Sequence, residues 1–111
     1  DHARVVLAPL KPISIKGKGW VWYDMEIINR AVSTIDMLIV DGPPEKIQPL
    51  SRYPALPLLL NKLNKNAVVI VDDAFNSEIK NMINLWRQEF PELSCEIIST
   101  EKGLAIFRKN T

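Results

Sequence analysis

Three aspartates stand where apolar runs end, and they are the residues of this chain best suited to chemistry. Asp41 follows the run Ile35–Val40, and Asp72 and Asp73 follow the run at residues 67–71. Ligands of open sheets bind beyond the carboxyl ends of the strands. Carboxylates that meet there repel one another unless a hard cation or a shared proton stabilises them, and oxygen ligands favour Mg²⁺, Ca²⁺ or Mn²⁺ over zinc. We therefore predict that Asp41, Asp72 and Asp73 converge as metal ligands.

A purely structural interpretation of the same acids stays open. Asp41 precedes Gly42, Pro43 and Pro44 and can close a turn there, and Asp73 can cap the helix that follows. In that case the acids bind no metal.

The elements that position these acids follow from hydrophobic patterning. Apolar or alternating runs predict strands at residues 4–8, 20–23, 35–40, 67–71, 95–100 and 104–109. Apolar residues three and four apart predict a helix capped by Asp24, one over residues 55–63, and one capped by Asn76 or Ser77. Strands that alternate with helices predict an α/β fold in one domain, residues 1–111: a mostly parallel sheet flanked by helices and ending in an antiparallel hairpin.

Composition excludes several classes of function. The net charge of +1 gives no electrostatic footprint for nucleic acid, and the single cysteine and single histidine, Cys95 and His2, exclude disulfide frameworks and histidine-based catalytic triads. The apolar runs are far shorter than the roughly 20 residues that span a membrane. We expect a cytoplasmic protein that binds neither nucleic acid nor membrane.

Three stretches together resemble a known family. Residues 35–44 read IDMLIVDGPP, residues 52–59 read RYPALPLL, and residues 69–74 read VIVDDA. In combination they look like a bacterial class I S-adenosylmethionine-dependent methyltransferase. The resemblance implies a Rossmann-like fold with seven strands in the order 3-2-1-4-5-7-6, the last strand antiparallel.

Against that order, the chain resembles the carboxyl-terminal half of the enzyme. Residues 4–8 match the third strand, residues 35–40 the fourth, residues 67–71 the fifth, and the terminal hairpin the sixth and seventh. The first strand, with its Gly-rich turn for the cofactor, and the second strand, with its ribose-binding acid, have no counterpart in these residues, so the resemblance implies a methyltransferase fold truncated at the N-terminus.

The resemblance also implies roles for single residues. Ala8, Pro9 and Leu10 match the turn that borders the adenine, while Asp41 and Gly42 match the strand end next to the methyl-transfer centre. Asp72 and Asp73 match an acidic pair that binds Mg²⁺ with Asp41 in the metal-assisted members. The implied reaction is in-line O-methylation of a small hydroxylated acceptor, with either a metal or Asp41 as general base activating the hydroxyl.

Two questions stay open at this stage. Trp20, Trp22 and Tyr23 are suited either to stacking an acceptor or to the core. The rival to an enzyme is a non-catalytic remnant or interaction module on the same scaffold.

Exposed strand edges predict self-association. Residues 4–8 should pair beside residues 35–40 or swap onto a second copy, which gives a two-fold dimer whose affinity for S-adenosylmethionine is weak or absent.

Overall fold

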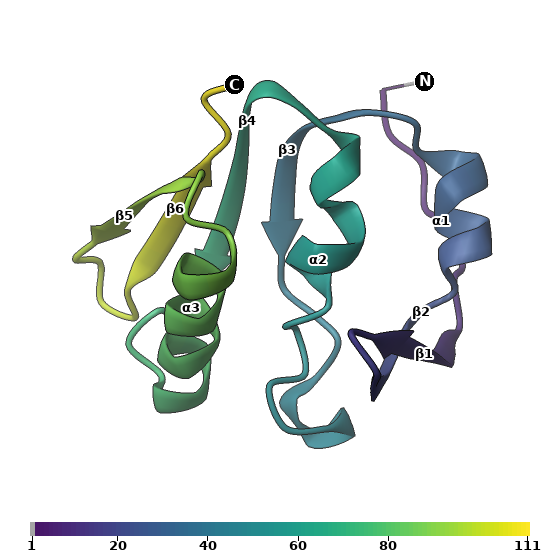
Figure 1. Cartoon of the computed structure of the whole chain (residues 1–111), viewed down its shortest axis with the longest axis horizontal. Helices are drawn as coiled ribbons and strands as arrows, with labels where there is room; N and C mark the ends of the chain where they lie inside the picture. Colours follow the sequence, from purple (N-terminus) through teal and green to yellow (C-terminus); the bar gives the residue numbers. More distant parts are fainter. Residues whose placement is uncertain (1) are drawn as a thin grey trace.

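A four-stranded sheet forms the centre of the protein (Figure 1). The computed structural model describes residues 2–111. The strands are β3 (Ile35–Val40), β4 (Leu63–Asp72), β5 (Ser94–Ile98) and β6 (Leu104–Arg108). Their spatial order is β3-β4-β6-β5, because the last strand inserts between the two before it.

The prediction of a mostly parallel, Rossmann-like sheet is wrong. Only β3 and β4 pair in parallel, whereas β6 pairs antiparallel with both β4 and β5. The physical reason is that β6, the second strand of the predicted antiparallel hairpin, inserts beside β4, and residues 4–8 add no parallel strand to the sheet. The protein is a small α+β domain with a mixed sheet and a separate two-stranded antiparallel sheet.

That second sheet is a hairpin of β1 (Leu10–Ile15) and β2 (Lys18–Tyr23). Lys16 and Gly17 form its turn with φ angles of 51° and 81°. Positive φ at both central residues is the geometry of a type I′ turn, whose twist matches that of the strands it joins. The strand predicted at residues 20–23 is therefore confirmed, and it begins two residues earlier.

The strand predicted at residues 4–8 is wrong, because this segment is extended but pairs with no strand. It runs beside helix α1 (Met25–Ala31), where the Arg4 guanidinium donates to the carbonyl of Ala31 at 2.8 Å. Val5 is fully exposed and Leu7 is 86% exposed. A β-branched run indicates strand propensity, but a strand also needs a partner edge, and the chain pairs β1 with β2 instead.

Two helices cover one face of the four-stranded sheet (Figure 1). Helix α3 (Ser77–Glu89) begins at the predicted cap Asn76, whose side chain accepts hydrogen bonds from the amides of Glu78 and Ile79. Helix α2 (Ala55–Leu59) is shorter than predicted, because Leu60–Lys62 form a 3-10 turn and Leu63 already begins β4. A further 3-10 turn, Glu45–Ile47, lies in the loop after β3.

The core lies between these helices and the sheet. Trp86 of α3 is completely buried and meets Phe107 of β6 edge-to-face, with ring centroids 5.6 Å apart. Val69 and Val71 of β4 lie in the same cluster. Residues two apart in a strand point to the same face of the sheet, so Val69 and Val71 both point to the face that the helices cover.

Candidate functional site

The end of β3 meets the end of β2 at Gly42. A Cβ atom added to Gly42 would lie 2.7 Å from the hydroxyl oxygen of Tyr23, so a larger residue would fit here only if the Tyr23 side chain moved. Asp41 next to it is exposed, and Pro43 behind it is buried after a cis Gly42–Pro43 peptide bond. The acid that the sequence singled out therefore stands in solvent beside an aromatic hydroxyl.

Tyr23 also lines an open apolar pocket of about 400 Å³, which we call the N-terminal pocket. Three elements form it: the extended N-terminal segment, the end of β2 and helix α1. Its lining residues are Val6, Leu7, Ala8, Tyr23, Ile28, Ala31 and Val32. Tyr23 thus contributes both to this pocket and to the contact at Gly42.

Only one of the three residues that were predicted to border the adenine lines this pocket. Ala8 lines it, whereas Pro9 and Leu10 are exposed and do not. The carbonyl of Pro9 instead accepts a hydrogen bond of 2.8 Å from the backbone amide of Asp24, which fixes the N-terminal segment against the start of α1.

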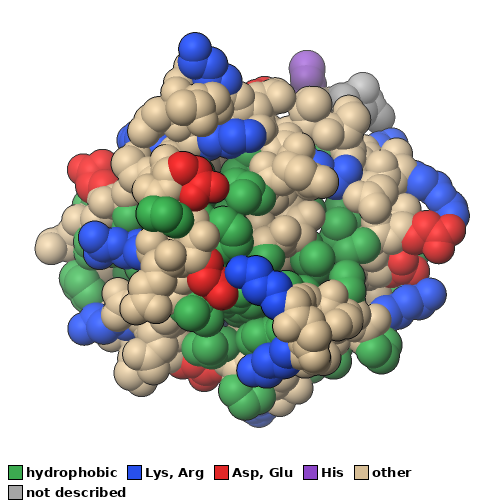
Figure 2. Space-filling view, viewed as in Figure 1, with side chains coloured by type: hydrophobic (Ala, Val, Ile, Leu, Met, Phe, Trp, Pro, Cys, Tyr) green, Lys and Arg blue, Asp and Glu red, His purple; other side chains and the backbone are tan. Residues whose placement is uncertain are grey.

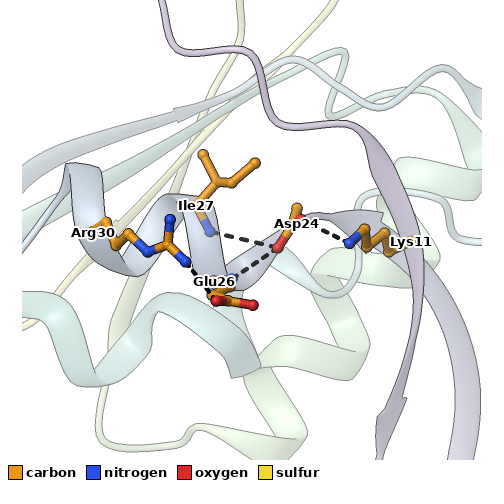
Figure 3. Close-up of polar contacts among 5 residues, drawn as sticks. All are labelled: Lys11, Asp24, Glu26, Ile27 and Arg30. Atoms are coloured by element: carbon orange, nitrogen blue, oxygen red, sulfur yellow. Dashed lines mark hydrogen bonds and ion pairs between the residues drawn. The ribbon is translucent and has the colours of Figure 1, made fainter.

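Asp24 organises the helix wall of the pocket (Figure 3). One carboxylate oxygen accepts from the amide of Glu26 at 3.0 Å and from that of Ile27 at 3.5 Å, as the predicted cap should. The other oxygen lies 3.1 Å from the ammonium of Lys11 on β1. The hydrogen bond from Lys11 holds the pKa of Asp24 below its ordinary value, with the two amides adding to the effect against the opposing effect of burial.

Helix α1 carries a second ion pair one turn further on. Arg30 and Glu26 lie four residues apart with nitrogen and oxygen 2.5 Å from each other, also drawn in Figure 3. Both side chains are well exposed, so this pair supports the helix weakly. The residues of α1 that line the pocket are only half-buried, and the helix contains no fully buried residue.

The structure does not bring Asp41, Asp72 and Asp73 together as a ligand set. Within residues 2–111, no three histidine, cysteine, aspartate or glutamate side chains are grouped so that they could hold a metal ion. Asp72 is exposed at the last position of β4, and Asp73 bends the chain with a φ of 59°. Asp73 does not cap α3 either, since Asn76 has that role and the Asp73 carbonyl accepts from the Asn76 amide.

The tryptophans of β2 belong to the core. Trp20 and Trp22 are 6% and 4% exposed, and Trp20 stacks on the buried ring of Tyr53 with centroids 4.8 Å apart. The Tyr53 hydroxyl donates to the Glu89 carboxylate, and burial, followed by this acceptor, raises the pKa of Tyr53 well above its ordinary value. Of the aromatic arm, only Tyr23 remains half-exposed at the candidate site.

The sequence predicts Ile28, Ala31 and Val32 on one face of the helix capped by Asp24, but it gives no indication that this face lines a pocket. The sequence signal that could have identified the pocket is the alternation of side chains between the two faces of β2. Because Trp20 and Trp22 face inward, Tyr23 must face the opposite way, toward α1.

Comparison of the chain with models of known protein families and with curated proteins finds no match. In residues 2–111, no helix has both the length and the apolar character needed to cross a membrane. The geometry of the site must therefore support any functional proposal by itself.

The cap at Asp24 gives a prediction about pH. Asp24→Ala should lower the thermal midpoint, and Asp24→Asn should lower it less, because asparagine still caps the helix but cannot pair with Lys11. A carboxylate whose folded pKa is depressed stabilises the fold above its unfolded pKa, about 3.9, and loses this contribution as the pH falls through the folded value. The difference in midpoint between the native chain and Asp24→Asn should therefore shrink below about pH 4. Calorimetric scans at several pH values test this, and a constant difference down to pH 2 would contradict it.

The contact at Gly42 gives a second prediction. Gly42→Ala should destabilise the protein by roughly 1 kcal/mol, because its methyl group meets the Tyr23 hydroxyl. In a Tyr23→Phe background the clashing oxygen is gone, so the same substitution should cost little. A double-mutant cycle in urea measures this coupling. Equal costs in both backgrounds would show that the Tyr23 hydroxyl does not restrict position 42.

Proposed function

We propose that this chain provides the adenine-facing wall of an S-adenosylmethionine-dependent methyltransferase site, with Asp41 at the methyl-transfer centre. The observation that carries the proposal is the N-terminal pocket. Its volume of about 400 Å³ lies within the range of small-molecule sites, roughly 300–1,000 Å³. Tyr23 is the aromatic residue among aliphatic lining residues, a lining that suits a flat heteroaromatic ring.

The position of this pocket agrees with the family resemblance. Of the three residues that the resemblance puts beside adenine, Ala8 lines the pocket, and Pro9 and Leu10 do not. Tyr23 connects the pocket to Gly42, the residue after the acid that the resemblance puts beside the methyl group. The two predicted parts of the cofactor site are therefore joined through one side chain.

The last four strands agree with one part of the order that the resemblance implies, although the predicted Rossmann-like sheet is wrong. The resemblance implies the order fourth, fifth, seventh, sixth for the last four strands, with the seventh antiparallel to its neighbours. The strands that match them lie in the order β3-β4-β6-β5, and β6 is antiparallel to both β4 and β5. Only the order of these four strands agrees with the family, and the sheet itself is mixed.

The chemistry that these residues could perform is limited and specific. S-adenosylmethionine, when bound, supplies an electrophilic methyl group that an acceptor hydroxyl attacks in line. The pocket would hold the adenine and so align the methyl group. The exposed carboxylate of Asp41 would accept the proton of the hydroxyl. The described residues do not form a Mg²⁺ site, so metal activation has no part in this proposal. The acceptor would be a small hydroxylated molecule, and the cytoplasm supplies the cofactor.

An interaction module remains the second candidate, and one observation favours it. Met37 and Ile39 of β3 are 56% and 65% exposed, on a strand whose continuous apolar character predicted burial. Exposed apolar surface of this kind marks sites where proteins associate.

Adjacent valines allow a matched test of the ligand pocket. Val6 lines it, whereas Val5 is fully exposed and does not. Adenosine at millimolar concentration should shift the amide resonances of Ala8, Tyr23 and Ile28 in ¹⁵N-labelled protein. Val6→Asp should abolish these shifts, because it puts a charge in an apolar cavity, and Val5→Asp should preserve them. The absence of saturable shifts at the pocket, or equal shifts in both variants, would refute the proposal.

A further inference from the structure

The face of the four-stranded sheet opposite α2 and α3 is apolar. Side chains alternate along a strand, and the buried positions Val69, Val71, Ala105 and Phe107 face the helices. Their neighbours in sequence face the other way. Together with the residues that pair with them in register, these define what we call the open face: Met37, Ile39, Val68, Ile70, Ile98, Leu104 and Ile106.

Nothing in residues 2–111 packs over the open face as α2 and α3 pack over the other. None of its seven residues belongs to the core or packs against it. Met37, Ile39 and Ile98 are exposed, and the other four are partly exposed. The helix side of the molecule looks different, since Lys, Arg, Asp and Glu side chains there are interspersed among the apolar ones (Figure 2). A contiguous apolar surface over four strands marks a docking site.

Two opposite charges lie at the two ends of the open face. Asp72 is in register with Leu104 at one end, and Arg108 is in register with Val68 at the other. Both side chains are exposed, and neither forms an ion pair with a described residue. Glu96 belongs to the same face but lies on the outer strand β5, at the rim where its charge stays in water.

This charge pattern is complementary to itself. Two copies packed face to face about a two-fold axis that crosses the strands would run antiparallel to each other. Asp72 of one copy then approaches Arg108 of the other at both ends, with Ile70 and Ile106 between them. A two-fold axis along the strands would instead bring like charges to the same end, so the charges favour the antiparallel arrangement.

We propose that the open face is the interface of a homodimer in which two copies of this chain pack sheet against sheet, with reciprocal Asp72–Arg108 ion pairs at its ends. Sheets packed in this way lie about 10 Å apart, a distance that an arginine and an aspartate can bridge. The proposal differs from pairing through the β3 edge, since it buries Met37 and Ile39 rather than extending the sheet.

Sedimentation velocity over a range of concentrations tests the proposal, in buffer with EDTA so that divalent cations cannot bridge acids. Ile39→Lys should shift the protein to monomer. The control Ile47→Lys changes an isoleucine that is 40% exposed in the loop after β3, away from the open face, and should leave the dimer unchanged. Circular dichroism confirms that both variants are folded.

A charge swap separates this interface from all others. Asp72→Lys and Arg108→Glu should each weaken the dimer about tenfold, because each creates two like-charge contacts. The double variant should restore the native dissociation constant. A protein that is monomeric at high concentration, a dimer insensitive to Ile39→Lys, or single variants whose defects add in the double variant would each overturn the proposal.

Discussion

Tyr53 joins the β1–β2 hairpin to the rest of the molecule, and the candidate site depends on that junction. Its buried ring stacks on Trp20 of β2, and its carbonyl accepts a 3.0 Å hydrogen bond from the indole of Trp86 on α3. Its hydroxyl donates to Glu89, which also pairs with Lys16 in the hairpin turn. One residue therefore contacts the hairpin, the helix layer and, through Trp86, the core beneath it.

Other contacts also attach the hairpin, since Ile15 and Trp22 are buried in the core. The side-chain amide of Gln48 pairs with both backbone groups of Val21, accepting at 2.8 Å and donating at 2.7 Å. Gln48 lies in the loop after β3, so this contact ties β2 to that loop. It therefore helps to hold Tyr23 next to Gly42 in the same loop. Tyr23 lines the N-terminal pocket, whose helix wall α1 is attached to the rest of the molecule by the partly buried Met25 and Ile28 rather than by a fully buried residue.

Local signals in the sequence predicted most elements and failed where pairing decided the outcome. Asp24 and Asn76 were identifiable as caps because capping depends on residues within one turn. The apolar runs of β3 and β4 predicted parallel strands, and these two do pair in parallel. Periodicity carries no information about where β6 inserts, and only the family resemblance implied a last strand that lies between the two before it. Residues 4–8 have strand propensity but no partner, which no local pattern reveals.

The candidate site was also predictable only in part, because it depends on how segments that are distant in the sequence pack together. Asp41 and Ala8 were both selected from the sequence. In the structure Ala8 lines the pocket, and Asp41 is exposed to solvent. The convergence of Asp41 with Asp72 and Asp73 was inferred from two strand ends being neighbours. Asp72 follows the alternation of β4 onto the open face, however, and Asp73 turns away with a positive φ. The three acids therefore do not form one ligand group.

Amide hydrogen exchange measures most directly whether Tyr53 holds the hairpin and hence the site. In Tyr53→Leu, the amides of β1 and β2 should exchange at least about tenfold faster, while those of β4 and β6 keep most of their protection, because local opening is separate from global unfolding. Tyr53→Phe keeps the stack on Trp20 and should leave the hairpin protected. Equal loss of protection in β2 and β4, or no loss in β2, would contradict the role of Tyr53 as the junction.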